Sequence, residues 1–281
     1  MRNLVNKSLK VILIFTVLVF FSRFIHAANK NDTIHPVKVI KILTIGNSFA
    51  ENAGFFLNEI TESVPGNKII ITKANIGGCS LEKHSNLIKE CEGDSTLKSY
   101  YNQYTLKNLL ETDQYDFVTI QQYSAFSFKP ETYQPYADNL CQSVHEHVPG
   151  AKIVIHQTWA YSSNCERLKQ WGISRDEMHK GLVACYNKLA EHLNAEMLPS
   201  GNAFYTSYKK HPQIDLWKQD RYHANEYGCY LAGCVWFGKL FNISPVKIKF
   251  VPDGFDPKTA IFLRRIAAQG LKKRNNQTLI K

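Results

Sequence analysis

The 281-residue chain contains no C-x-x-C pair, no internal repeat and no low-complexity stretch. Its seven cysteines therefore lack the paired spacing that is typical of a structural zinc site. His145 and His147 stand two residues apart on a predicted helix, where their side chains would point to different faces. We expect no bound metal and no other cofactor. The even composition predicts a single domain over residues 37–272.

The apolar run near the N-terminus is also short. Residues 1–10 carry only positive charge, and the run at 11–21 falls well below the roughly 20 residues needed to span a bilayer. The small pair Ala27-Ala28 follows, where a signal peptidase would cut, and no cysteine stands nearby to carry a lipid anchor. The sequence predicts a signal peptide over 1–27, a linker over 28–36, and an exported protein, periplasmic or extracellular, without a stable membrane span.

Acidic residues are missing from both ends of the chain. The first 27 residues and the segment 264–281 hold ten of the 34 basic residues and none of the 24 acidic ones. The sequence between them has 24 basic and 24 acidic residues, so the net charge of +10 belongs to the ends. Nucleic acid is therefore not expected as a partner. Residues 273–281 are expected to form a basic tail.

Apolar, β-branched runs alternate with helical patterns along the chain, which is typical of a parallel sheet with helices on both faces. The sequence thus predicts an α/β, three-layer sandwich with about five strands. The predicted strands lie at 37–45, 68–73, 117–121, 152–156 and 196–198. The predicted helices lie at 53–64, 104–111, 131–148, 176–193, 225–241 and 257–271.

Small or polar residues follow each of the first four predicted strands. They stand at 46–49, 75–78, 121–124 and 156–159. Because the carboxyl ends of parallel strands meet at one edge of a sheet, loops from several strands converge there. We expect the functional site at this edge.

Two short motifs point to nucleophilic catalysis. Ser48 stands just after the first strand and behind Gly46, which permits a tight turn. Asp220 precedes His223 by three residues, so its carboxylate can orient the imidazole as in a catalytic triad. Each motif is weak alone, but together they predict Ser48 as nucleophile, His223 as general base and Asp220 as the orienting acid.

A second serine has a similar setting, in Gly93-Asp94-Ser95. That tripeptide follows a polar, charged segment at 88–92 instead of a strand, so Ser48 is the preferred nucleophile. The nucleophile elbow of α/β-hydrolases, G-x-S-x-G, does not fit Ser48, because Ala50 stands where the last glycine belongs.

Three blocks of this sequence resemble the SGNH, or GDSL-type, hydrolases over essentially the whole predicted exported chain. In that family the first block supplies the nucleophile and a backbone oxyanion donor, matched by Gly46-Asn47-Ser48. The second supplies a glycine N–H, matched by Gly77 or, preferably, Gly78. The last is D-x-x-H, matched by Asp220 and His223. The resemblance implies a flavodoxin-like sheet, the SGNH hydrolase fold.

Within this superfamily the chain resembles the exported bacterial proteins of the DUF4886 type. The resemblance is carried by the runs Gly46-Asn47-Ser48-Phe49, Gly77-Gly78-Cys79-Ser80-Leu81 and His156-Gln157-Thr158-Trp159-Ala160-Tyr161.

The chain departs from the wider family at two places. Asn47 replaces the usual aspartate of the first block, and the third block, G-x-N-D, is missing. Its place is taken by residues 121–124, so another side chain must supply the third oxyanion donor. Gln121 is the first candidate, and Ser124 or Gln122 is the second.

Further residues near the four loops are candidates for contact with substrate. His84 could contact the substrate or be a structural histidine, and Trp159 could stack on a sugar or pack in the core. The candidates are Gly77, His84, Gln122, Ser124 and Trp159. If the exported protein contains a disulfide, Cys79 and Cys91 are the pair we expect.

The motifs and the resemblance together predict an exported serine esterase. Its expected substrate is a small acyl ester, above all an acetyl group on a carbohydrate, because many exported relatives act on glycans. Acyl transfer to a glycan by the same triad is one alternative. The other is a glycan-binding module that keeps the fold without turnover.

Overall fold

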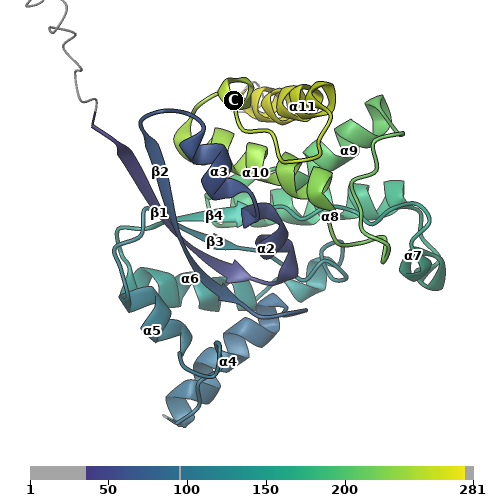
Figure 1. The fold of residues 1–281 in the computed structure, drawn as a ribbon. Helices are drawn as coiled ribbons and strands as arrows, with labels where there is room; N and C mark the ends of the chain where they lie inside the picture. Colours follow the sequence, from purple (N-terminus) through teal and green to yellow (C-terminus); the bar gives the residue numbers. More distant parts are fainter. Residues whose placement is uncertain (1–35, 95, 276–281) are drawn as a thin grey trace, which may run out of the picture. The chain divides into compact units, whose positions relative to one another are not determined.

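Five parallel strands form the centre of the structure, in the order β2-β1-β3-β4-β5 (Figure 1). This arrangement confirms the predicted α/β fold with a parallel sheet. The computed structural model describes residues 36–94 and 96–275 of the chain. The strands are β1 Lys38–Gly46, β2 Asn67–Asn75, β3 Phe117–Ile120, β4 Lys152–His156 and β5 Glu196–Leu198.

Helices cover both faces of the sheet. One face carries α2, α3 and α10, with α11 packed on α10, and the other carries α5 and α6, with α4 packed on α6 (Figure 1). The helix α8 contacts α6 at one end, where His192 Nε2 of α8 is 2.9 Å from Asp138 Oδ1 of α6. The bounds are α2 Ser48–Gly54, α3 Leu57–Glu62, α4 Leu81–Gly93, α5 Leu106–Glu111, η1 Pro130–Thr132, α6 Tyr136–His147, α7 Glu166–Trp171, α8 Arg175–His192, α9 Ser200–Lys210, α10 Glu226–Phe241, η2 Pro245–Lys247 and α11 Pro257–Asn275.

The central strands are apolar on both faces because helices bury them from both sides. Their side chains form one core with the inner faces of the helices. The helix α10 is apolar around its whole circumference, and 13 of its 16 residues are buried. Core residues of the strands include Ile42, Leu43, Ile45, Val118, Ile120, Val154 and Ile155.

Three helices, α4, α7 and α9, are absent from the sequence-based prediction. The helix α4 follows the glycine loop because the Ser80 hydroxyl accepts the Lys83 N–H at 3.1 Å and caps its first turn. The predicted helix at 53–64 also differs from the structure. Asn47 caps a new helix that starts at Ser48, and a separate helix, α3, follows it.

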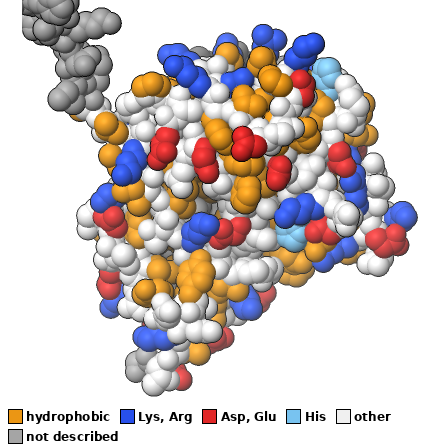
Figure 2. All heavy atoms as spheres, viewed as in Figure 1, with side chains coloured by type: hydrophobic (Ala, Val, Ile, Leu, Met, Phe, Trp, Pro, Cys, Tyr) orange, Lys and Arg blue, Asp and Glu red, His pale blue; other side chains and the backbone are white. Residues whose placement is uncertain are grey.

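Several sequence predictions fall outside the described residues. These are the signal peptide at 1–27, the linker up to residue 35, Ser95 and the last six residues of the basic tail. Among the described residues, none of the helices is both long enough and apolar enough to cross a membrane. Basic and acidic side chains are interspersed over the face shown in Figure 2.

Candidate active site

The predicted triad residues lie in direct contact. His223 Nε2 is 2.8 Å from Ser48 Oγ, and His223 Nδ1 is 2.7 Å from Asp220 Oδ2. Ser48 is the first residue of α2, directly beyond β1, whereas Asp220 and His223 belong to the loop before α10. The fold thus joins residues that stand 175 positions apart. Ser48 and His223 are partly exposed and therefore accessible to a ligand.

The contacts of His223 fix where its proton lies. An ionised carboxylate only accepts hydrogen bonds, so His223 Nδ1 carries the proton that Asp220 Oδ2 accepts. His223 Nε2 is then the acceptor, and the Ser48 hydroxyl donates to it.

Asp220 is held as a carboxylate by its surroundings. Burial raises the pKa of its carboxyl, but hydrogen bonds from the His223 ring and from the backbone N–H groups of Tyr222 and His223 lower it, and the net direction is downward. The two N–H groups donate to Asp220 Oδ1 at 3.1 and 3.0 Å. The oxygen that faces His223 is therefore free to accept from the imidazole alone.

Two backbone N–H groups of the predicted oxyanion site have no acceptor among the described residues, those of Ser48 and Gly78. Gly78 has a φ of 64°, in the left-handed region that favours glycine. The Ile76 N–H donates to Gly46 O at 3.0 Å and so ties the glycine loop to the end of β1. Both loops lie at the same edge of the sheet.

Asn47 connects these two loops through the hydrogen bonds of its side chain. It is fully buried, its Oδ1 accepts the Phe49 N–H at 3.0 Å, and its Nδ2 donates to Cys79 O at 2.9 Å. Gln121 Nε2 also donates to Asn47 Oδ1, at 2.7 Å, and Gln121 Oε1 accepts from His156 Nδ1 at 2.8 Å. A buried polar chain therefore runs from β4 through β3 to the loop that carries Ser48.

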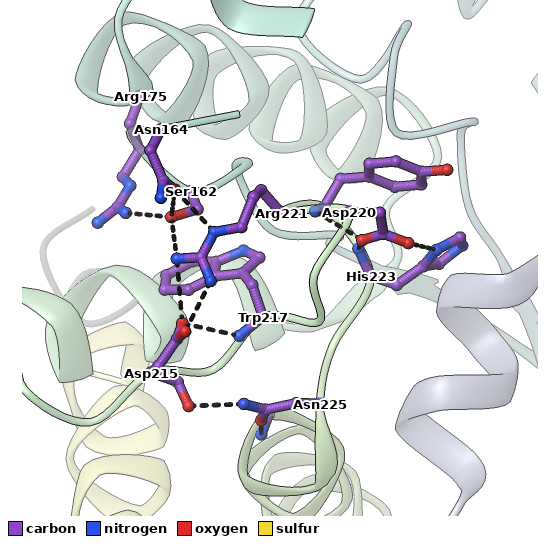
Figure 3. A network of polar contacts seen from close by, with 11 residues as sticks. Ser162, Asn164, Arg175, Asp215, Trp217, Asp220, Arg221, His223 and Asn225 are labelled. Carbon is purple, nitrogen blue, oxygen red and sulfur yellow. Dashed lines mark hydrogen bonds and ion pairs between the residues drawn. The ribbon is translucent and has the colours of Figure 1, made fainter. Parts of the chain in front are cut away.

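The loop of Asp220 and His223 is held differently, by charged and polar side chains around Arg221 (Figure 3). The Arg221 guanidinium donates to Asp215 at 2.6 Å, to Ser162 Oγ at 2.7 Å and to Asn164 Oδ1 at 2.7 Å. In Figure 3 it points away from His223, on the opposite side of the loop from the Asp220 carboxylate. Arg221 has a φ of 64°, a conformation that costs a non-glycine residue about 1–3 kcal/mol. The network holds the backbone in this turn.

Comparison with known proteins identifies the family. A family model described as a domain of unknown function, DUF4886, matches residues 41–271. The chain belongs to the DUF4886 family. A crystal structure of a DUF4886 family protein from Bacteroides uniformis is similar, with 27% sequence identity and a TM-score of 0.76 over 84% of this chain and 95% of that chain. A search of curated proteins found no match.

More distant structures share the fold of this DUF4886 protein. A proposed SGNH hydrolase from Slackia heliotrinireducens has 23% identity and a TM-score of 0.56, covering 71% of this chain and 98% of its own. An acetyl xylan esterase has 12% identity and a TM-score of 0.51, covering 71% of this chain and 99% of its own. The SGNH-type superfamily resemblance is thus confirmed at the level of fold.

The prediction that Gln121 supplies the third oxyanion donor is corrected by its contacts in this DUF4886 chain. Its side chain is 1% exposed, and the amide lies between Asn47 and His156. A Cβ on Gly46 would lie 3.0 Å from Gln121 Oε1, so a glycine there makes room for the side chain. Gln121 supports the nucleophile loop instead of facing a ligand.

The two substitutes for Gln121 are also engaged and buried. Gln122 Oε1 accepts the N–H groups of Leu81 and Tyr123, and its Nε2 donates to Thr132 O at 2.7 Å. Ser124 Oγ is 2.9 Å from the Tyr161 hydroxyl. Both side chains fasten loops, so the predictions of a donor or substrate-contact role for them are corrected as well.

His84 is a structural residue, against the prediction of a substrate contact. It is fully buried, with Nδ1 2.8 Å from the Tyr100 hydroxyl and Nε2 2.9 Å from Gly46 O. Since a carbonyl oxygen only accepts, Nε2 carries the proton. Burial lowers the pKa of His84 to about 4, so its ring is neutral and supports the residue two positions before Ser48.

Trp159 also belongs to the core instead of the substrate surface. Its ring is fully buried between Phe49 and Phe204, at centroid distances of 4.5 and 4.3 Å. Its Nε1 donates to Tyr222 O at 3.0 Å, which fixes the backbone next to His223. Of the predicted substrate contacts, Gly77 alone is exposed, beside Gly78.

Two positioning residues, Asn52 and Arg221, were not predicted from the sequence. Asn52 Oδ1 accepts the Ala224 N–H at 3.2 Å and joins the nucleophile helix to the base loop. Its spacing of four from Ser48 places both on one helix face, a signal that was available in the sequence. Arg221 lies inside the D-x-x-H block, but only the left-handed turn reveals its role.

The expected disulfide between Cys79 and Cys91 is not formed, and both residues are free thiols. Cys91 lies near the end of α4, which begins at Leu81, so about ten residues at 1.5 Å each separate it from Cys79. That separation exceeds the roughly 7 Å limit for the Cα atoms of a disulfide.

Proposed function

We propose that this DUF4886 protein is an exported serine esterase that removes a small acyl group, above all acetyl, from a carbohydrate. One observation carries the proposal: an unbroken line of hydrogen bonds from Ser48 Oγ through His223 to Asp220, at 2.8 and 2.7 Å. This is the arrangement that makes a serine hydroxyl nucleophilic.

The proposed reaction follows from the protonation of these groups. His223 Nε2 accepts the hydroxyl proton as Ser48 Oγ attacks the acyl carbon, and Asp220 stabilises the resulting imidazolium. The N–H groups of Ser48 and Gly78 donate to the negative oxygen of the tetrahedral intermediate. His223 then returns the proton to the leaving alcohol. A water molecule attacks the acyl-serine by the same route and releases the acid.

The carbohydrate and acetyl parts of the proposal, and export, have separate grounds. They rest on the resemblance to exported SGNH hydrolases and on the fold shared with an acetyl xylan esterase. Export rests on the sequence of residues 1–27. If the full chain is expressed in a bacterial host, the mature N-terminus should be Ala28 or Asn29, determined by mass spectrometry of the purified protein.

The deciding experiment is hydrolysis of 4-nitrophenyl acetate by the wild type and by Ser48→Ala. We expect the loss of a single hydroxyl to abolish turnover while circular dichroism and melting temperature stay unchanged. Ser95→Ala is the matched control and should retain activity. An active Ser48→Ala variant, or a wild type without hydrolysis, would overturn the proposal.

A further inference from the structure

Arg167 is an unpaired cation close to the proposed triad. Its NH1 donates to the Tyr123 hydroxyl at 3.3 Å, and its guanidinium carbon lies 4.2 Å from the centre of the Tyr222 ring. The side chain is partly exposed. No carboxylate among the described residues lies within ion-pair distance of it.

Three other cations of this region are engaged in contacts. Arg221 is paired with Asp215 at 2.6 Å, and Lys169, two positions after Arg167 on α7, is paired with Glu166 at 3.1 Å. Arg175 is 5% exposed, and its guanidinium lies 3.6 Å from the centre of the Tyr208 ring. Arg167 thus differs from them in being both accessible and without an acidic partner.

The position of Arg167 relates it to the reacting atoms. The Tyr222 ring is a neighbour of both Arg167 and His223, and the ring centroids of Tyr222 and His223 are 4.4 Å apart. Two short steps, 4.2 Å and 4.4 Å, therefore lead from the guanidinium to the imidazole. Tyr123 follows β3 and Arg167 follows β4, so both belong to the same edge of the sheet as Ser48.

We propose that Arg167 and Tyr123 form a subsite for a carboxylate, and that the preferred substrate is an acyl ester that carries a carboxylate near the ester, as an acidic sugar does. The inference rests on the proposed esterase function and names its substrate class. A guanidinium has five N–H donors in a planar fork, which matches the two oxygens of a carboxylate. The Tyr123 hydroxyl accepts from Arg167 and keeps its own proton for a ligand. One unpaired cation balances the single negative charge of a carboxylate.

The test compares two substrates that differ in one charge, 4-acetoxybenzoate and its methyl ester, by acetate release. In the wild type we expect the ratio of kcat/KM for the acid to that for the methyl ester to exceed the ratio for Arg167→Gln by about tenfold. The change should lie in KM, because the carboxylate is bound equally before and during the reaction. Added salt should lower the ratio in the wild type and leave it constant in Arg167→Gln.

Lys169→Gln is the matched control, because it removes an exposed cation from the same helix. It should leave the ratio unchanged. Equal losses for both substrates in Arg167→Gln would overturn the inference and would mean that Arg167 only supports the Tyr222 turn. A wild type whose ratio equals that of Arg167→Gln would overturn it too.

A binding measurement separates this inference from the esterase proposal. Ser48→Ala should bind 4-hydroxybenzoate, observed by ligand NMR, and Ser48→Ala combined with Arg167→Gln should bind it about tenfold more weakly. This result would support the carboxylate subsite even if the wild type hydrolysed no ester. Equal binding by the two variants would contradict the subsite even if hydrolysis depends on Ser48.

Discussion

The two halves of the proposed triad are held by opposite kinds of interaction. The half that carries Ser48 rests on buried, neutral groups, because Asn47, Gln121, His84 and His156 are all at most 1% exposed. The half that carries Asp220 and His223 rests on the Arg221 network, in which the Arg221 and Asp215 side chains are 25% and 51% exposed.

Because of this difference, the two halves should be sensitive to different changes. A buried polar chain costs stability when any member loses its partner, because the remaining group stays without a hydrogen bond. A partly exposed ion pair contributes less and weakens with salt. The nucleophile half should therefore respond to pH and to substitution, and the base half to ionic strength.

The largest expected effect separates catalysis from support. His223→Ala should lower kcat/KM for 4-nitrophenyl acetate by about 10⁴-fold, with little loss of stability, because the side chain is partly exposed. His84→Ala should lower the free energy of unfolding instead, since the ring is buried between Tyr100 and Gly46. Urea unfolding and steady-state kinetics on both variants provide the check, and equal kinetic losses would contradict the assignment of roles.

The second effect concerns pH and the nucleophile half. Burial lowers the pKa of His84 to about 4 and that of His156 to about 3. The unfolded chain therefore binds protons on these histidines near pH 6.5, whereas the folded chain does so only at lower pH. Stability is then complete above pH 6.5 and falls as the pH drops below it. When the pH falls from 7 to 5, each of these histidines should lower the free energy of unfolding by about 2 kcal/mol.

Urea unfolding at both pH values measures this slope. Burial also lowers the pKa of His179 to about 4. His84→Gln should therefore remove about a third of the slope, whereas His145→Gln, at an exposed position, should leave it as it is. A slope that does not depend on His84 would contradict this account.

The third effect concerns the buried chain itself. Gln121→Ala removes the acceptor of His156 Nδ1 and one of the two donors to Asn47 Oδ1, and we expect a loss of about 3 kcal/mol in the free energy of unfolding. Gln114→Ala, at an exposed position, should change it by less than about 0.5 kcal/mol. If Gln121→Ala kept full stability but lost turnover, the residue would act directly on the oxyanion after all.

The smallest effect belongs to the base half. Arg221→Ala should lower the free energy of unfolding by about 2 kcal/mol and should lower kcat, because alanine keeps the strained turn and loses the guanidinium. Arg221→Gly should cost less, since glycine adopts a φ of 64° without strain. In the wild type, 1 M salt should reduce kcat slightly. Identical behaviour of the two variants would show that the turn is not strained.

The sequence was informative where patterns are local. Strand ends and the D-x-x-H spacing singled out Ser48, Asp220 and His223, and these three residues are in contact in the structure. The parallel sheet followed from the alternation of apolar runs. The helix α4 was missed because its apolar residues are sparse and its start depends on the Ser80 cap.

The roles of the supporting side chains could not be read in the same way. Gln121, His84 and Trp159 stand beside the predicted loops, yet all three point into the core. Their orientation depends on partners far along the chain, such as Asn47 for Gln121 and Phe204 for Trp159. A sequence pattern shows that a polar residue follows a strand, but not which side of the sheet edge it faces.

The separation of 175 positions between Ser48 and His223 has a consequence for how the proposed site is completed. Contacts between distant parts of a chain form late, because the entropy of closing a long loop opposes them. Ser48 and its buried support come from residues 47–156, whereas the contact of Asn52 forms only when Ala224 docks. A chain truncated before residue 220 would keep a nucleophile without a base. In the proposed esterase, hydrolysis therefore reports on completed folding, and an incompletely synthesised chain would carry no activity.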